Sequence, residues 1–333
     1  IALQHHGDAI QFANIYIKEL SAAASPFRAE VVPAPGIKGP FGTVIDPAGD
    51  LYFVEMTTNR LSRLDGSGKV TVLATNLDGP HNLAVVRDRA IYIANTWKNQ
   101  VQKYDLKTGA LGAFAGTGEK GFSGDGGPAA QAKFDGIHCV SYAADKLYLA
   151  DLGNRRIRMI DLKTGTVSTV AGNGQKGVPP DGATATDVPL VDPRAVIADN
   201  AGNIFILERS GNALRHVDPR GKVRTVAGTG QKGFSGDGGD AKLATFNGPK
   251  HLCFDLEGNV LIADTENHVI RKYMVKHGTI VRVAGTGKKG DAGLNGSPLE
   301  MELNQPHGVY VHRDGTLYIS DSSNDRILKI SAR

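Results

Sequence analysis

Residues 248–269 read GPKHLCFDLEGNVLIADTENHV, and this stretch decides the fold because its pattern recurs six times along the chain. It starts with a Gly-Pro turn that leads into a short apolar strand. A polar turn follows, and then a second apolar strand, Val260-Leu261-Ile262-Ala263, which ends in Asp264. Short runs of β-branched and aliphatic residues between Asp and Gly turns are typical of β-strands.

The opening turn of this stretch recurs at regular intervals. The six openings are Gly39-Pro40-Phe41-Gly42, Gly79-Pro80-His81-Asn82, Gly136-Ile137-His138-Cys139, Asp192-Pro193-Arg194-Ala195, Gly248-Pro249-Lys250-His251 and Gln305-Pro306-His307-Gly308. Measured at the residue after the Pro or Ile, the spacings are 40, 57, 56, 56 and 57 residues. A repeat of about 40–57 residues with four short strands is typical of a propeller blade.

The six second strands are almost wholly apolar, which indicates strands covered on both faces. Each ends in a polar residue: Glu55, Asn95, Asp151, Glu208, Asp264 or Asp321. The last repeat supplies only three strands before Arg333, and residues 27–33 match the missing fourth strand. We therefore predict an all-β, six-bladed β-propeller of four-stranded antiparallel blades. We expect the N-terminal strand to close its last blade and so leave no open sheet edge there.

The pattern Asp264-Thr265-Glu266-Asn267-His268-Val269 resembles the NHL repeat, and the resemblance covers about residues 30–330. It implies a six-bladed propeller. It does not imply one function, because NHL propellers include lyases, adhesion modules and RNA-binding proteins.

Residues 1–20 do not fit the repeat. Their pattern, carried by Leu3, Gln4, His6, Gly7, Asp8, Phe12, Asn14, Ile15 and Ile17, resembles the C-terminal end of a 3-keto-disaccharide hydrolase-type domain. We expect residues 1–25 to be the tail of a preceding domain plus a linker, and residues 26–333 to be the propeller. The chain starts with Ile1, so we expect a piece of a longer, sugar-processing protein. The alternative is a two-strand extension that matches by coincidence.

Composition narrows the class of partner. The 333 residues are 41% hydrophobic and carry a net charge of +4, with no Lys/Arg run interleaved with aromatics, so we expect no nucleic-acid partner. No apolar run approaches the ~20 residues that span a bilayer, so we expect no membrane partner. Cys139 and Cys253 lie outside any zinc-binding spacing and are predicted to be buried, unpaired thiols. We expect a monomer in an extracytoplasmic location, periplasmic or secreted.

One residue from each opening is expected to lie at the mouth of the central channel, where the innermost strands of the blades begin. These six residues are Phe41, His81, His138, Arg194, Lys250 and His307. We call this set the channel-mouth ring. Three imidazoles and two fixed cations without a carboxylate are an unusual combination, so the ring is the strongest functional signal in the sequence.

Three interpretations of the ring stay open. His81, His138 and His307 could hold a catalytic zinc ion. The Pro-His openings at His81 and His307 are similar to those of the propeller lyase of peptide α-amidation, and that resemblance implies zinc. Alternatively, Arg194 and Lys250 form a pocket for a carboxylate, uronate or phosphate group, with a histidine as acid or base. The third interpretation is that the ring has no small-molecule role.

On the second interpretation, His138 and Arg194 would be catalytic, and Phe41, Lys250 and His251 would bind substrate. Long glycine-rich loops run from Gly116 to Gly127 and from Gly228 to Gly239. They are either structural turns or the rim of a substrate funnel, with Phe122 and Phe234 stacking on sugars.

The carboxylates at the strand ends could bind calcium. The other interpretation is structural, in which each accepts hydrogen bonds from backbone amides two residues further on.

Two functions remain. The first is a carbohydrate-active lyase or hydrolase that acts at the channel mouth on a small molecule or glycan. The second is a non-catalytic propeller that binds a glycan or a protein and is attached to a catalytic domain. The histidine-rich ring favours the first function, and the lack of an evident nucleophile or acid pair favours the second.

Overall fold

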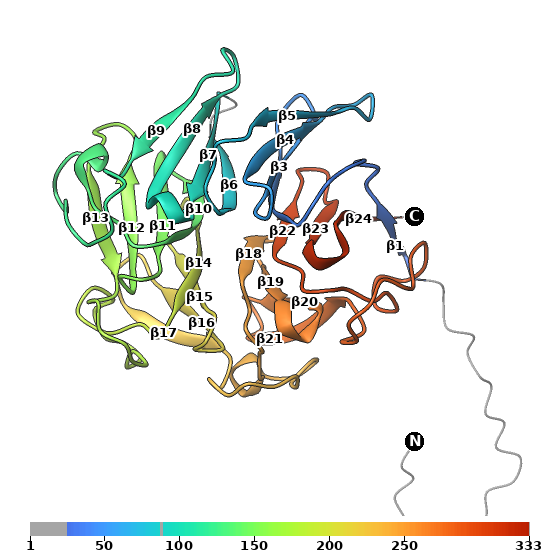
Figure 1. Cartoon of the computed structure of the whole chain (residues 1–333). Coiled ribbons are helices and arrows are strands. Elements are labelled where there is room, and N and C mark those ends of the chain that lie inside the picture. The colour runs from blue at the N-terminus through green and yellow to red at the C-terminus, as the bar shows by residue number, and fades with distance from the viewer. Residues whose placement is uncertain (1–24, 87–88, 333) are drawn as a thin grey trace, which may run out of the picture.

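The computed structural model describes residues 25–86 and 89–332, and it confirms the predicted architecture. Six four-stranded antiparallel sheets surround a central axis, with β6, β10, β14, β18 and β22 nearest the centre (Figure 1). The helices of the described part are short 3₁₀ turns: η1 (Thr96–Lys98), η2 (Ala129–Gln131), η3 (Ala241–Leu243), η4 (Thr265–Asn267) and η5 (Ser322–Asn324). None of these helices has the length and apolar character needed to cross a membrane.

The blades follow one another along the chain, each from its innermost to its outermost strand. Blade 1 contains β2 (Pro40–Ile45), β3 (Leu51–Glu55), β4 (Arg60–Leu64) and β5 (Val70–Ala74). Blade 2 contains β6 (Pro80–Val86), β7 (Ala90–Asn95), β8 (Gln100–Asp105) and β9 (Leu111–Ala115). Blade 3 contains β10 (Ile137–Ala143), β11 (Lys146–Asp151), β12 (Arg156–Asp161) and β13 (Val167–Ala171).

The second half of the ring repeats this arrangement. Blade 4 contains β14 (Pro193–Ala198), β15 (Ile204–Glu208), β16 (Ala213–Val217) and β17 (Val223–Ala227). Blade 5 contains β18 (His251–Phe254), β19 (Val260–Asp264), β20 (Val269–Met274) and β21 (Thr279–Ala284). Blade 6 contains β22 (Gly308–Val311), β23 (Leu317–Asp321), β24 (Arg326–Ala332) and the N-terminal β1 (Phe27–Val31).

The predicted closure of blade 6 is confirmed. Strand β1 pairs antiparallel with β24, in a register that runs from Phe27 opposite Ala332 to Val31 opposite Leu328. The two ends of the propeller are thus held in one sheet, and the outer edge of blade 6 is made by the start of the chain.

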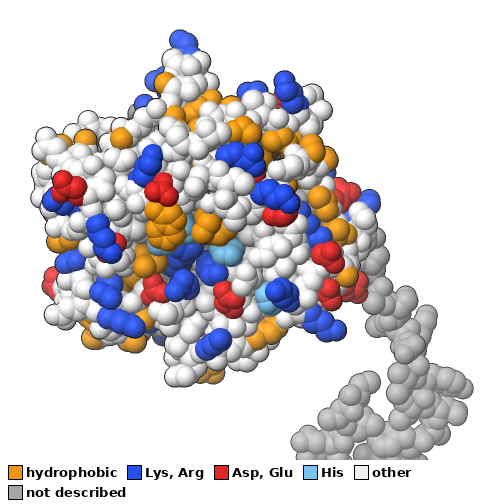
Figure 2. Space-filling view, viewed as in Figure 1, with side chains coloured by type: hydrophobic (Ala, Val, Ile, Leu, Met, Phe, Trp, Pro, Cys, Tyr) orange, Lys and Arg blue, Asp and Glu red, His pale blue; other side chains and the backbone are white. Residues whose placement is uncertain are grey.

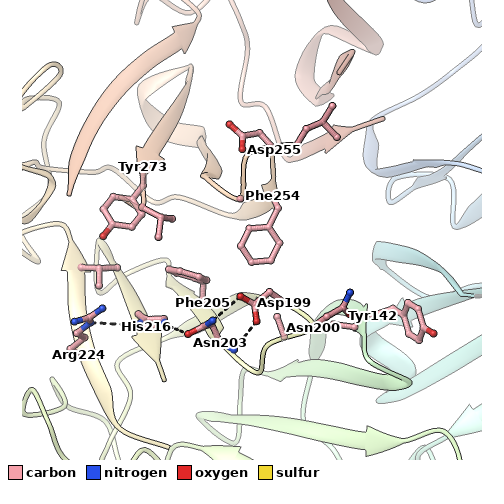
Figure 3. A pocket seen from close by; sticks show the side chains of 16 residues that line it. Tyr142, Asp199, Asn200, Asn203, Phe205, His216, Arg224, Phe254, Asp255 and Tyr273 are labelled. Carbon is pink, nitrogen blue, oxygen red and sulfur yellow. Dashed lines mark hydrogen bonds between the residues drawn. The ribbon is translucent and has the colours of Figure 1, made fainter. Parts of the chain in front are cut away.

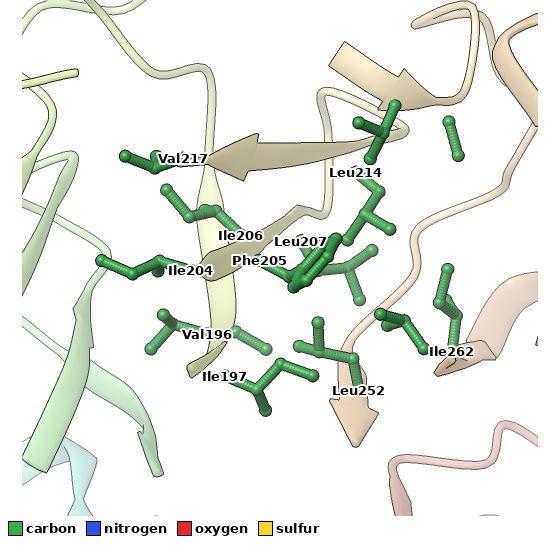
Figure 4. Packing of buried hydrophobic residues seen from close by; sticks show 14 of the residues in the cluster. Val196, Ile197, Ile204, Phe205, Ile206, Leu207, Leu214, Val217, Leu252 and Ile262 are labelled. Atoms are coloured by element: carbon green, nitrogen blue, oxygen red, sulfur yellow. The ribbon is translucent and has the colours of Figure 1, made fainter. Parts of the chain in front are cut away.

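Apolar side chains fill the space between neighbouring blades, which is why the second strands are apolar on both faces. Between blades 4 and 5, Phe205 and Leu207 of β15 belong to the same buried cluster as Leu252 and Ile262 of blade 5 (Figure 4). Ile206 and Leu207 are fully buried. This packing makes the propeller a rigid frame for the residues at its two ends.

The polar residues at the strand ends have a structural role, although not with the partners expected from the sequence. Each accepts a hydrogen bond from a backbone amide 16 or 17 residues earlier in its own blade, not two residues on. The six amide–acceptor pairs are Lys38–Glu55, Asp78–Asn95, Asp135–Asp151, Val191–Glu208, Asn247–Asp264 and Asn304–Asp321. The expected partner was wrong because the antiparallel fold brings each opening turn back beside the end of the second strand.

A second set of hydrogen bonds links each blade to the next. At the start of the third strand, the side chain of a residue in the left-handed conformation accepts a hydrogen bond from a backbone amide in the opening turn of the following blade. Gly136 N, for example, donates to Asn99 Oδ1 at 2.9 Å. The other four acceptors are Asn59, Asn212, His268 and Asp325. Arg155 takes this place between blades 3 and 4, and its side chain has no acceptor atom. That junction is therefore built differently from the other five.

The glycine-rich loops hold buried arginines of the blades that follow them. Asp125 of the first loop lies 2.8 Å from Nη2 of Arg158 on β12, and Asp237 lies 2.8 Å from Nη2 of Arg271 on β20. Both arginine side chains are fully buried. Because a buried guanidinium needs a partner, the repeated Gly-Asp-Gly pattern of these loops has a structural explanation.

Candidate functional site

The three histidines of the channel-mouth ring are oriented alike, since the Nδ1 of each is hydrogen-bonded to the carbonyl two residues earlier. The contacts are His81 to Gly79 O at 2.8 Å, His138 to Gly136 O at 2.7 Å and His307 to Gln305 O at 2.8 Å. A carbonyl oxygen only accepts, so each Nδ1 carries the proton. In the neutral imidazole, Nε2 then keeps a lone pair that can accept a hydrogen bond or a proton.

The structure brings most of the ring into direct contact. Phe41 stacks on His307 with ring centroids 4.0 Å apart and meets His81 at 5.2 Å, edge to face. The ring centroids of His81 and His138 are 4.6 Å apart. Lys250 Nζ lies 3.1 Å from Nε2 of His307. In the same view as Figure 1, histidine, basic and hydrophobic side chains gather around a hollow at the centre of this face (Figure 2).

Arg194 is the most unusual member of the ring. It is only 6% exposed, and its Nε is buried without a hydrogen-bond partner among the described residues. No carboxylate in that part of the chain forms an ion pair with it, in contrast to the buried Arg158, Arg215 and Arg271. Burial, reinforced by the charge of Arg209, lowers the pKa of Arg194 to about 9. The guanidinium therefore stays protonated at neutral pH, buried and unpaired.

This charge acts on its neighbours. Burial lowers the pKa of His81 well below its usual value, and the positive charge of Arg194 lowers it further. Burial and the charges of Lys250 and Arg194 likewise lower the pKa of His307 well below its usual value. Both imidazoles are therefore neutral at neutral pH.

Lys250 differs from Arg194 because it has a carboxylate partner. Glu266 Oε1 lies 2.9 Å from Lys250 Nζ. Burial lowers the pKa of Lys250, and this carboxylate partly offsets the effect. The ring thus contains one paired and one unpaired cation.

Trp97 in η1 belongs beside the ring, and sequence reasoning missed it. Its indole lies edge to face with both His81 and His138, with ring centroids 5.4 Å and 5.8 Å apart. The Trp97 residue is 53% exposed. Gly79 makes this position possible, since a Cβ there would lie 2.0 Å from the indole Nε1. The available signal was a single tryptophan placed two residues after Asn95, the polar end of a second strand.

A cavity of about 440 Å³ continues from the ring toward blades 4 and 5. Arg209, Lys232, Lys250 and Glu266 are among the residues that line it. The charge near the ring is therefore mainly positive, which favours an anionic ligand at this end of the propeller.

His251 lies on the axis, and not with Lys250 in the ring. Its Nε2 is 2.6 Å from Asn82 Nδ2 of blade 2, which faces blade 5 across the channel. Burial and the charge of Arg194 lower the pKa of His251 to about 4, so the imidazole is neutral. Beyond this contact, a cavity of about 280 Å³ occupies the other half of the channel, between Cys139, Cys253 and Tyr310 among others.

Both cysteines are free, as predicted; Cys139 is buried as expected, whereas the Cys253 residue is partly exposed. Burial raises the pKa of the Cys139 thiol to about 12, which makes it unreactive at neutral pH.

The opposite face of the propeller carries a cavity of about 560 Å³ between blades 4 and 5 (Figure 3). Its polar side chains bond to one another. Arg224 Nε donates to His216 Nδ1 at 3.3 Å, and His216 Nε2 lies 3.0 Å from Asn203 Oδ1. Asn203 Nδ2 in turn donates to Asp199 at 2.7 Å. These groups already satisfy each other, so this cavity lacks the unpaired charge that distinguishes the channel-mouth ring.

Phe122 and Phe234 lie in the glycine-rich loops, where arginines of the blades cover them. The Arg156 guanidinium is 3.7 Å from the centroid of Phe122, and that of Arg271 is 5.7 Å from the centroid of Phe234. Both rings are 43% exposed, and the aromatic contacts within the ring do not include either one. The structure thus brings Phe41, His81, His138 and Lys250 together with His307, but not these two phenylalanines.

The three histidines do not fit a three-ligand zinc site. Nε2 of His307 faces the ammonium of Lys250, and Phe41 packs against both His81 and His307. Across the described residues, no group of three or more His, Cys, Asp or Glu side chains is placed to hold a metal ion.

The fold defines the class: the protein is a six-bladed β-propeller, and part of its last blade matches the NHL repeat. The model of the NHL repeat matches residues 303–330, which include most of blade 6. The chain is 31% identical over 192 residues to SUPPRESSOR OF QUENCHING 1, a chloroplastic protein of Arabidopsis thaliana, and the match covers 54% of this chain and 18% of that protein. It is 27% identical to NHL repeat-containing protein 2 of Bos taurus, over 78% of this chain and 38% of that protein. The chain therefore spans well under half the length of both relatives.

Solved structures share the fold. A protein of unknown function from Bacteroides thetaiotaomicron aligns with a TM-score of 0.70 at 19% identity, covering 92% of this chain and 76% of that one. A streptogramin B lyase aligns with a TM-score of 0.58 at 16% identity, covering 92% of this chain and 98% of that one. At these identities the likeness shows the propeller fold alone.

Proposed function

We propose that the protein is a carbohydrate-active propeller whose channel-mouth ring binds the carboxylate of its ligand through Arg194. The observation that carries this proposal is the guanidinium itself, buried and without a carboxylate partner in the described part of the chain. An uncompensated buried charge is costly, and the fork of a guanidinium matches a carboxylate in two parallel hydrogen bonds. A bound carboxylate would remove that cost.

The reaction that suits these groups is a lyase reaction, an elimination next to the carboxylate. Arg194 neutralises the carboxylate and so makes the adjacent C–H more acidic. Nε2 of His138 takes that proton, because its Nδ1 already donates to Gly136 and no described residue bonds to Nε2. The C–H electron pair forms a C=C bond while the C–O bond at the next carbon breaks, and the leaving oxygen takes a proton from water.

His138 suits the role of base better than His307 does. Nε2 of His307 lies against the Lys250 ammonium, which occupies its lone pair. Nε2 of His138 has no such neighbour in the described part of the chain, and it lies in the next blade to Arg194 along the ring.

Isothermal titration calorimetry with D-glucuronate, acetate and D-glucose tests the binding step. We expect both carboxylates to bind and glucose to bind far more weakly. We expect R194Q to weaken carboxylate binding by at least about tenfold. R194K should restore part of it, since lysine keeps the charge but not the planar fork. R220Q, on the exposed turn between β16 and β17, is the matched control and should bind like the wild type. Equal carboxylate affinity in the wild type and R194Q contradicts the proposal.

Turnover is measured separately with uronate-containing oligosaccharides, as ultraviolet absorbance of the new C=C bond next to the carboxylate. We expect H138Q to lose turnover while it keeps the wild-type affinity for acetate. Binding that depends on Arg194 without turnover in the wild type would favour the non-catalytic, glycan-binding function instead.

A further inference from the structure

Trp97 is the only tryptophan of the chain, and its indole is both fixed and exposed. The edge-to-face contacts with His81 and His138 hold it from one side. Its backbone amide donates to Asp78 O at 3.1 Å, and the missing Cβ of Gly79 leaves the space in which the indole lies. More than half of this large apolar surface is nevertheless in solvent, at the edge of the ring that contains Arg194.

Three kinds of group therefore occur together on this face. Arg194 supplies an unpaired cation. His81 and His138 each present an Nε2 lone pair, with the Nδ1 proton donated to a backbone carbonyl. Trp97 supplies a preorganised aromatic face. A ligand that satisfies all three needs a carboxylate, hydroxyl groups that donate to imidazole nitrogens, and a ring with an apolar face.

We propose that the ring selects a hexuronate in its pyranose form, with the sugar ring stacked on Trp97 and the carboxylate at Arg194. This inference rests on the proposed function, since it adds Trp97 to the carboxylate site. A simple carboxylate such as acetate would use Arg194 alone. An apolar ring acid such as cyclohexanecarboxylate would use Arg194 and Trp97 but leave the histidine nitrogens without donors. D-Glucuronate would use all three.

The single tryptophan makes the contact directly observable. In a fluorescence titration, D-glucuronate should change the intensity or the wavelength of Trp97 emission, whereas acetate at saturating concentration should leave the emission almost unchanged. By calorimetry, the wild type should bind glucuronate at least about tenfold more tightly than acetate, with cyclohexanecarboxylate between the two.

Variants separate the aromatic face from the charge. W97A should lose most of the preference for glucuronate over acetate and keep only the part that the histidine nitrogens contribute, while its acetate affinity stays at the wild-type value. W97F keeps an aromatic face and should retain glucuronate affinity within about threefold. Thermal denaturation of both variants checks that the fold is intact, and W97F keeps the test decisive if W97A does not fold.

The outcomes distinguish this inference from the proposed function. If carboxylates bind in an Arg194-dependent way but W97A binds glucuronate like the wild type, Trp97 is not a sugar platform and only this inference fails. If no carboxylate binds, or R194Q binds as the wild type does, the proposed function fails and this inference fails with it. Cyclohexanecarboxylate binding as tightly as glucuronate would exclude hydroxyl recognition by the histidines and overturn the assignment to a hexuronate.

Discussion

The ammonium of Lys250 lies 3.1 Å from Nε2 of His307, and this contact makes His307 different from the other two histidines of the channel-mouth ring. Both nitrogens of His307 are occupied, because Nδ1 lies 2.8 Å from Gln305 O. His307 therefore orients Lys250 and is not available as a base. The site is asymmetric although the fold that builds it is nearly sixfold symmetric.

This contact predicts the effect of removing the lysine charge. Burial is the main cause of the lowered pKa of His307, and the charge of Lys250 is the next. K250M removes a like charge, so the pKa of His307 should rise while staying below its usual value. An NMR titration of the imidazole nitrogens measures the shift. K232M, which changes an exposed lysine of the adjacent cavity, is the control and should leave that pKa unchanged. An unaltered His307 pKa in K250M would contradict the assigned contact.

The hydrogen bonds between blades predict a difference among three substitutions of Asn99, which has a φ of 52° and accepts from Gly136 N. N99D keeps an acceptor and should stay within about 0.5 kcal/mol of the wild type. N99G loses the acceptor at a cost of about 1–2 kcal/mol, because Gly136 N loses its partner. N99A also forces alanine into the left-handed region and should cost about 1 kcal/mol more than N99G. Urea denaturation measures the series, and equal stability of N99A and N99D would refute the role given to the side chain.

The closure of blade 6 predicts that two truncations differ sharply. The predicted tail and linker, residues 1–25, lie outside the described residues except for Ser25. Removing residues 1–24 should lower the melting temperature by no more than a few degrees if, as predicted, they are peripheral to the propeller. Removing residues 1–33 also deletes β1, which pairs with β24 along five residue pairs and exposes the edge of β24 when it is lost. We expect a large drop in melting temperature or aggregation of the longer truncation. Similar melting temperatures for the two would show that β1 does not stabilise the ring.

Because the pKa of His81 is lowered in the folded protein, we expect the protein to lose stability in mild acid. This pKa is lowered in the folded state mainly by burial and then by Arg194, whereas in the unfolded chain it is about 6.5. Above pH 6.5 both states hold a neutral imidazole, and His81 contributes no pH dependence. As the pH falls below 6.5, the unfolded chain takes up the proton first, so the free energy of unfolding decreases by up to about 1.4 kcal/mol per pH unit.

The free energy of unfolding of the wild type and H81Q, measured in urea at pH 7.5 and pH 5.5, tests this sign. H81Q has no titrating group at this position and should lose less stability between the two values. H277Q, at an exposed histidine, should retain the wild-type pH dependence. A wild type that gains stability toward pH 5.5 relative to H81Q would contradict the prediction.

The sequence predicts the fold well because each blade repeats the same local pattern. The apolar second strands, the opening turns and the missing fourth strand of blade 6 are all local features, and they place β1 beside β24 correctly. The residues at the channel mouth could be selected for the same reason, since a repeat carries one residue to the same place in every blade.

What the sequence does not predict depends on contacts between distant segments. Asn82 and His251 are 169 residues apart and meet only because blades 2 and 5 face each other. Trp97 can lie beside the ring because Gly79 leaves space for its indole, and no pattern in the repeat indicates this space. Phe122 suggested a sugar platform from its loop alone, but the position of Arg156 above its ring is a tertiary feature.

The contact between Asn82 and His251 also affects access along the central channel. These side chains bridge the inner strands of blades 2 and 5, and they also line the cavity of about 280 Å³ on the far side from the ring, so they narrow the passage between the two. On the proposed function, a polymeric ligand would therefore reach Arg194 by a chain end or a short branch. A product that leaves by the opening at the ring would then have to clear the site before the next substrate could enter.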